Sequence, residues 1–186
     1  MSNNVAVLYK SKYGTTRTYA KWIADKVHGD LYGIDNISFE NLNNYDFIVF
    51  AGALYAGKLS SVKGIKRFYK KLKGKKNLYC VIVGLTNPED KEFYNNAVNQ
   101  NFKSDEKDNM KFHFLRGSID FDKLKLHHAL MMHMLRRIIA TKTVKTEDEK
   151  ALLDNYGKKI DFLNKNSIEE IVLDIKNKNK ELKINS

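Results

Sequence analysis

Residues 5 to 17 read VAVLYKSKYGTTR, and this stretch decides the fold class. Its first five residues are apolar and have the length of a short strand. A polar, hydroxyl-rich turn follows, and Tyr19, Ile23 and Val27 then recur every four residues, as on one face of a helix. The chain therefore opens with a strand, a loop and a helix.

The alternation of strand and helix continues along the chain. The strands expected next are Leu31 to Ile34, Phe47 to Phe50, Leu78 to Val83 and Phe112 to Leu115. The helices expected between and after them are Lys63 to Leu72, Glu89 to Val98, Asp122 to Ala140, Thr146 to Leu163 and Ser167 to Glu181. Apolar runs without alternation indicate strands covered on both faces, and connections of this length require parallel crossovers. The sequence predicts an α/β, doubly wound parallel sheet with helices on both faces.

Composition narrows the functional classes. The 186 residues suit one globular domain, and 42% hydrophobic residues are enough for a packed core. Cys80, the single cysteine, permits no internal disulfide and no cysteine-based metal cluster, and we expect it to be buried. No apolar run reaches the roughly 18 to 20 residues of a membrane-spanning helix, and MSNNVAVLYK does not read as a secretory signal. These features favour a cytoplasmic protein.

The charge balance points to an acidic partner or surface. Lys and Arg number 33 against 22 Asp and Glu, a formal charge of +11. Nucleic acid is disfavoured because the lysines are spread along the chain. Within residues 122 to 145, basic residues flank a broad apolar surface. Two readings stay open for this segment: a helix that covers the sheet, or a peripheral contact with an anionic membrane, on the inner face of the cell membrane, near a quinone pool.

Three loops follow strands at the edge where doubly wound sheets bind ligands. In the first, Ser11 to Thr16, a phosphate would meet free backbone N–H groups, the helix dipole and the hydroxyls of Ser11, Thr15 and Thr16. Gly14 permits a tight turn there. The second loop, Ala51 to Lys58, is built of small residues around a Leu-Tyr pair suited to a flat ring. The third, Gly84 to Asn87, offers backbone amides and polar side chains.

Other chemistry is poorly supported. His127, His128 and His133 lie on one predicted helix, but their spacing and the lack of carboxylates give no metal site. A phosphate-receiving signalling domain shares the doubly wound topology. It needs acidic residues after the first and third strands, where this chain has Lys10-Ser11 and Ala51-Gly52.

SKYGTTR resembles the phosphate loop of flavodoxins, and YDFIVFAGALYAG resembles their third strand and ring-binding loop. The resemblance covers about residues 4 to 164 and implies the sheet order 2-1-3-4-5 and flavin mononucleotide (FMN) as cofactor. It implies a domain over residues 1 to 165, followed by a helical extension and polar tail over 166 to 186. The implied FMN-binding residues are Ser11, Lys12, Tyr13, Gly14, Thr15, Thr16, Ala53, Leu54, Tyr55, Ala56, Gly57, Leu85, Thr86 and Asn87.

Within that family the chain looks most like the quinone-dependent protoporphyrinogen IX oxidases of heme biosynthesis. The basis is the layout of FLRGSIDFDKLKLHHALMMHMLRRIIATKTVKTEDEKALLDNYG. This resemblance implies an FMN-dependent oxidoreductase that oxidises a porphyrinogen and passes electrons to a quinone. The alternative is a flavodoxin that carries electrons between protein partners. The net positive charge, with Lys58 in the ring loop, favours a raised flavin potential and hence an oxidoreductase. No catalytic residue is assigned.

Overall fold

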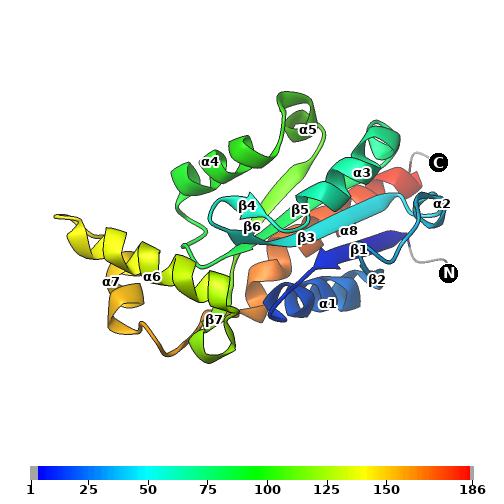
Figure 1. The fold of residues 1–186 in the computed structure, drawn as a ribbon. Helices are drawn as coiled ribbons and strands as arrows, with labels where there is room; N and C mark the ends of the chain where they lie inside the picture. Colours follow the sequence, from blue (N-terminus) through cyan, green and yellow to red (C-terminus); the bar gives the residue numbers. More distant parts are fainter. Residues whose placement is uncertain (1–3, 185–186) are drawn as a thin grey trace.

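The computed structural model describes residues 4–184 and contains a five-stranded parallel sheet (Figure 1). Its order is β2-β1-β3-β5-β6, which confirms the expected order when the parallel strands are counted along the chain. These strands are β1 (Val5–Lys10), β2 (Asp30–Gly33), β3 (Phe47–Tyr55), β5 (Asn77–Gly84) and β6 (Lys111–Arg116). The short β4 (Lys58–Leu59) pairs antiparallel with the end of β3.

Helices cover both faces of this sheet (Figure 1). One face is packed by α1 (Thr15–Val27) and α8 (Glu169–Ile184), the other by α3 (Val62–Leu72) and α4 (Lys91–Asn101). The short helices α2 (Phe39–Leu42) and α5 (Ser104–Asp108) lie in connections. Within the described residues, no helix is long and apolar enough to cross a bilayer.

Two hydrophobic cores result from the alternation of side chains along each strand. In β1, Ala6 and Leu8 belong to the core under α3 and α4, whereas Val5 and Val7 belong to the core under α1 and α8. Cys80 in β5 is fully buried, as expected. Because both faces of each central strand are covered, the strands read as continuous apolar runs.

The last helix, α8, and the short turn before it complete the second core. Ile168, Ile171, Val172 and Ile175 pack with residues of β1 and α1. These side chains belong to the segment expected as a C-terminal extension, and its polar residues continue the helix to Ile184. The final two residues of that segment lie outside the described range.

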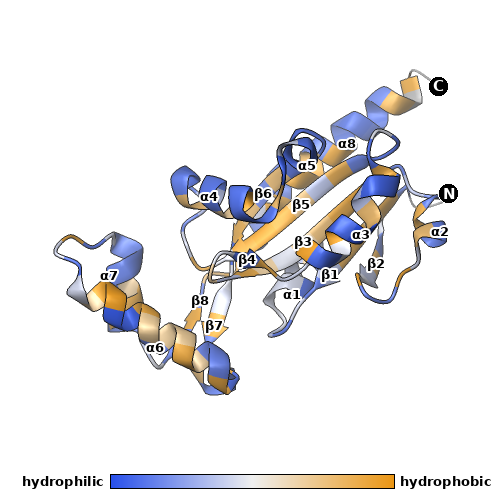
Figure 2. Cartoon of the chain, turned by 45° about the horizontal axis from the view of Figure 1, so that its top comes forward, coloured by the Kyte–Doolittle hydropathy of each residue, from blue (hydrophilic) through white to orange (hydrophobic). Residues whose placement is uncertain are grey.

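An arm projects from the sheet between β6 and the final helix, and we define it as residues 118–161 (Figure 2). It begins with β7 (Ser118–Asp120) and ends with β8 (Lys159–Asp161), which pair antiparallel. Between these strands lie the 3-10 turn η1 (Phe121–Lys123) and the helices α6 (Leu126–Thr141) and α7 (Glu147–Asp154). A second 3-10 turn, η2 (Lys165–Ile168), leads from the arm to α8.

The arm corrects two expectations. The helix expected from Thr146 to Leu163 ends at Asp154, because Gly157 adopts a left-handed φ of 86° and the chain then enters β8. Its predicted start is confirmed by a capping box between Thr146 and Glu149. The reading of 122 to 145 as a helix covering the sheet is wrong, because α6 buries only His128 and Ile139.

Candidate functional site

The three predicted loops converge on one edge of the sheet. Strand register places Lys10 beside Gly52, and Gly84 beside Arg116, so the carboxyl ends of these strands lie at the same edge of the sheet. Side chains and backbone then link neighbouring connections: the Ser60 hydroxyl donates to the Lys10 carbonyl at 3.2 Å, and the Gly117 N–H to the Gly84 carbonyl at 2.6 Å. This is the edge at which doubly wound sheets bind ligands.

The first loop leaves the amino end of α1 without a cap. Gly14 occupies the N-cap position at φ 97°, no side chain caps the backbone N–H groups of the first turn, and that turn holds no acidic residue. The space where a Cβ of Gly14 would lie is open. A helix of 13 residues with an uncapped, unneutralised amino end favours an anion at that end. The loop therefore fits a phosphate group.

The hydroxyls of Ser11 and Thr15 in this loop already have hydrogen-bond partners within the protein. Ser11 Oγ accepts the Gly14 N–H at 3.1 Å, which shapes the turn. The Thr15 hydroxyl lies 2.9 Å from the Ser118 hydroxyl at the base of the arm, and Thr16 is buried. Lys12 is exposed, and its Nζ lies 3.0 Å from His127 Nε2.

The second loop is a β-hairpin, because β3 extends five residues beyond the expected end at Phe50. Tyr55 pairs with Lys58, and the turn between them places Ala56 and Gly57 in left-handed conformations at φ 46° and 76°. Ala53 and Leu54 lie on the strand itself, with the Ala53 N–H held by the Ser60 hydroxyl at 2.9 Å. A paired hairpin fixes the direction of Tyr55 more firmly than a free loop would.

Tyr55 lies in a group of rings that comes from three separate segments. Its ring stacks on His128 of α6 with centroids 4.6 Å apart and an interplanar angle of 22°. Tyr13 of the first loop meets Tyr55 edge-on at 6.3 Å, and its hydroxyl lies 2.6 Å from His128 Nδ1. The arm therefore places an imidazole on the ring predicted to contact the flavin.

Burial and charge set the protonation of this group. The pKa of His128 is lowered, first by burial and then by the neighbouring Lys12, His127 and Lys125, so its imidazole stays neutral at pH 7. Burial raises the pKa of Tyr55 to about 12, and its phenol stays protonated. The group of rings is uncharged, and its stacked pair, Tyr55 and His128, suits contact with an aromatic ligand.

The third loop is tied to the arm. Arg116 Nε donates to the Leu85 carbonyl at 3.0 Å, and the other side of its guanidinium donates to Asp148 of α7 at 2.5 Å. Asp148 also accepts the Asn87 N–H at 2.8 Å. The Thr86 carbonyl accepts the Tyr94 hydroxyl at 2.8 Å. Contacts within the protein thus hold all three predicted residues of this loop in place.

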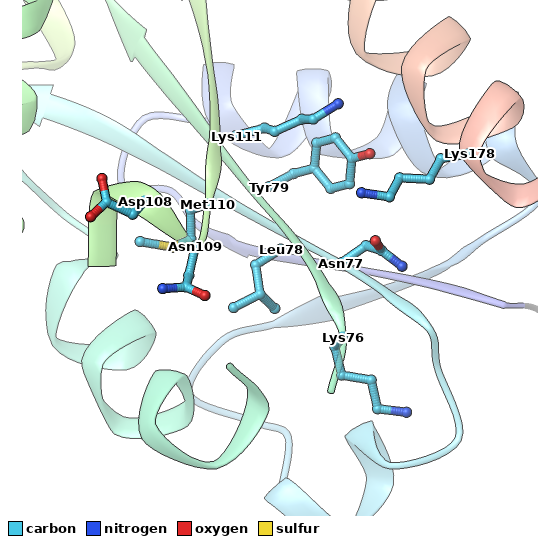
Figure 3. A pocket seen from close by; sticks show the side chains of 9 residues that line it. All are labelled: Lys76, Asn77, Leu78, Tyr79, Asp108, Asn109, Met110, Lys111 and Lys178. Carbon is cyan, nitrogen blue, oxygen red and sulfur yellow. The ribbon is translucent and has the colours of Figure 1, made fainter. Parts of the chain in front are cut away.

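A separate cavity of about 200 Å³ lies at the opposite end of the sheet, between the amino ends of β5 and β6 (Figure 3). Tyr79, Lys111 and Lys178 lie along one side of it. Its volume is below the roughly 300 to 1,000 Å³ of ordinary ligand sites, and Lys111 is already paired with Asp174 at 2.7 Å. We therefore place the candidate site at the three loops.

Sequence reasoning missed three participants in this region: Ser118, Arg116 and Asp148. Arg116 directly follows an apolar strand and precedes a glycine, a signal that marks the carboxyl edge. Its partner lies 32 residues away and is found only through the topology. Among residues 4–184 no group of three His, Cys, Asp or Glu side chains is placed to hold a metal ion.

Comparison with protein families gives a match over most of the chain. A family model described as a flavodoxin domain matches residues 6–146. An uncharacterized protein of Methanocaldococcus jannaschii is 40% identical over 67 residues, which are 36% of this chain and 43% of that protein. The matched region thus spans less than half of that relative's length.

Solved structures with similar folds have low sequence identity. A flavodoxin from the domain Archaea is 12% identical with a TM-score of 0.43, covering 81% of this chain and 94% of its own. A putative flavoprotein from Bacteroides eggerthii is 17% identical with a TM-score of 0.43, covering 76% of this chain and all of its own.

Proposed function

The chain belongs to the flavodoxin domain family, and from that premise we propose that it is an FMN-dependent oxidoreductase. Family membership implies FMN as the cofactor. When bound, FMN supplies the redox chemistry, while the protein supplies binding, orientation and electrostatics. The observation that carries the proposal is the uncapped amino end of α1 beside an uncharged group of aromatic rings.

In this proposal each loop has a distinct role. The first loop, Ser11 to Thr16, holds the FMN phosphate through backbone N–H groups and hydroxyls. The hairpin residues Ala53 to Gly57 lie along the isoalloxazine ring, with Tyr55 as the aromatic contact. Leu85, Thr86 and Asn87 border the ring from the third loop, which Arg116 and Asp148 hold in position.

We propose protoporphyrinogen IX as the substrate and a quinone as the electron acceptor. The layout of the arm supports this choice, because a long insertion between the fifth parallel strand and the last helix carries apolar and basic residues next to the ring loops. A quinone dissolved in lipid also requires peripheral contact with a membrane, and we include that contact in the proposal. The location in the cell that follows is the cytoplasmic side of the membrane.

Charge supports an oxidising role for the flavin. Lys58 is exposed at the hairpin, paired through its backbone with Tyr55. A cation near the ring stabilises the added negative charge of reduced FMN and so raises its midpoint potential. A measured potential well below that of free FMN would contradict this part of the proposal.

Two measurements test the proposed function in sequence. Anaerobic titration with FMN, FAD and riboflavin, followed by absorbance and fluorescence, is expected to give tight binding that requires the monophosphate. The FMN-loaded chain is then mixed with protoporphyrinogen IX and a quinone, and porphyrin fluorescence is expected to rise only when both are present. Absence of FMN binding would reject the redox function altogether.

The second candidate is an electron carrier between proteins. A carrier with a net charge of +11 would have acidic redox partners. Under this alternative FMN binds and cycles, but porphyrinogen is not consumed with any quinone. Turnover in the second measurement therefore separates the two functions.

A further inference from the structure

The outward side of α6 carries an apolar stripe, which we define as Leu126, Leu130, Met134 and Ile138. Their exposed fractions are 87%, 59%, 56% and 58%. A spacing of four residues keeps these side chains on one side of the helix. The buried residues His128 and Ile139 lie on the opposite side. The usual polarity of a surface helix is thus reversed along α6, and Figure 2 shows this helix standing apart from the sheet.

The surroundings of the stripe are positively charged. From Lys123 to Lys145 the chain has six basic residues and no acidic one, and two of the six are paired with carboxylates outside this range: Lys123 with Asp120 and Lys142 with Glu149. The acidic residues at the start of α7 are neutralised by partners within the protein: Glu147 by Lys150, Asp148 by Arg116 and Glu149 by Lys142. Arg137 is exposed on the same helix, and within residues 4–184 it has no ion pair. An apolar stripe with a basic border is therefore left open.

We propose that this stripe docks on an anionic lipid bilayer, with Leu126, Leu130, Met134 and Ile138 inserted at the headgroup boundary. Apolar side chains gain from leaving water, and the basic residues are attracted to anionic headgroups. A second copy of the chain is a poorer occupant, because the same six basic residues would meet their own copies across the contact.

The inference rests on the proposed function in one respect: it assigns the surface that brings the flavin site to a lipid-dissolved quinone. The same helix that carries the stripe places His128 against Tyr13 and Tyr55 from its other side. A helix is about 10 Å across. Docking through the stripe would therefore hold the cofactor loops roughly one helix diameter from the membrane surface.

Vesicle cosedimentation of the full FMN-loaded chain tests the proposal. Phosphatidylcholine vesicles containing phosphatidylglycerol are expected to bind the protein at low salt, and pure phosphatidylcholine vesicles to bind it much more weakly. The double variant Leu130→Gln, Ile138→Gln is expected to lose about tenfold in partitioning. Leu173→Gln on α8 is the matched control, because Leu173 is also 58% exposed, and it is expected to partition like the unaltered chain.

Several results would overturn the inference. These are an unaltered chain that ignores anionic vesicles at low salt, a double variant that still binds them, or a Leu173→Gln control that loses binding equally. Self-association abolished by the double variant, without vesicle binding, would assign the stripe to a second copy instead. FMN absorbance of each variant reports that the domain is folded. Stripe-dependent vesicle binding without porphyrinogen turnover would overturn the substrate and leave the docking surface standing.

Discussion

The hydroxyl oxygen of Tyr13 lies 2.6 Å from Nδ1 of His128, and this contact joins the loop of residues 11 to 16 to the arm. The same oxygen accepts the backbone N–H of Lys125 at 3.2 Å, so its own proton is free to point at the imidazole. A neutral His128 with Nδ1 as acceptor completes this arrangement, and burial favours that neutral form by lowering the pKa. The pair makes the position of α6 sensitive to protonation.

Stability is expected to fall as the pH drops below the ordinary histidine value of 6.5. Burial lowers the pKa of both His128 and His113, so the unfolded chain takes up protons before the folded chain does. The contribution of these two histidines to the free energy of unfolding is therefore complete above pH 6.5 and is progressively lost toward pH 5. Urea denaturation across this range is the measurement. His128→Gln should flatten the curve, and identical pH profiles for the variant and the unaltered chain would contradict the assignment.

Substitution of Gly14 should weaken FMN binding beyond its effect on folding. Gly14→Ala places an L side chain at φ 97°, which costs about 1 to 2 kcal/mol of folding free energy, and the altered turn is expected to weaken FMN binding about tenfold. Gly74→Ala is the matched control, since Gly74 also has a positive φ of 71° and open space but lies beyond α3. The unfolding temperature should be lowered similarly in both variants. Fluorescence titration should show weaker FMN binding only in the Gly14 variant. Equal FMN affinities in the two variants would count against the phosphate loop.

The ring of Tyr55, and not its hydroxyl, is expected to support flavin binding. Tyr55→Ala removes the stacked surface and should raise the FMN dissociation constant about tenfold, whereas Tyr55→Phe should change it less than twofold. Quenching of FMN fluorescence gives both values and reports stacking directly. A large effect of Tyr55→Phe would mean that the hydroxyl makes a contact absent from the ligand-free fold.

We expect the contacts of Arg116 to contribute most to holding the arm in place. Its guanidinium binds Leu85 and Asp148 and lies 3.6 Å from the centre of the Phe162 ring. Arg116→Ala should cost about 1 to 3 kcal/mol of unfolding free energy, because Asp148 loses its partner in a half-buried site. Arg116→Lys should restore little of this, since an ammonium cannot make the same forked contacts.

The control for this variant is Lys150→Ala, which breaks an exposed pair with Glu147 and should change stability by less than about 0.5 kcal/mol. Hydrogen exchange supplies the second readout, with faster exchange in α7 expected only in the Arg116 variant. Unchanged exchange in α7 would show that other contacts hold the arm.

The parallel sheet and its helices were predictable because the burial of each strand is visible in its own residues. Val5 to Tyr9 and Leu78 to Val83 are continuous apolar runs, and such runs indicate strands covered on both faces. The loops after them could then be placed at one edge, although the second proved to be a hairpin. The extension of β3 through Tyr55 could not be predicted, because the small residues from Ala51 to Ala53 are equally compatible with a strand and with a flexible turn.

The arm could not be predicted, because apolar content alone does not reveal which side of a helix is buried. Residues 126 to 139 are apolar nearly all round, and only their contacts show that His128 faces inward while Leu130 faces solvent. The pairing of Arg116 with Asp148 joins β6 to α7, two elements far apart in the sequence. The end of α7 at Asp154 was also not indicated by the spacing of apolar residues. Long-range contacts of this kind are absent from local pattern.

The packing of α8 against α1 has a consequence for protein synthesis. Helix α1, which follows the first loop, is covered by Ile168, Ile171 and Ile175, which leave the ribosome after the whole of the sheet. A nascent chain therefore holds an open apolar face along β1 and α1 until the last helix emerges. Cofactor capture and closure of that face are expected to be late, nearly simultaneous events, which exposes the unfinished chain to chaperones until α8 has emerged.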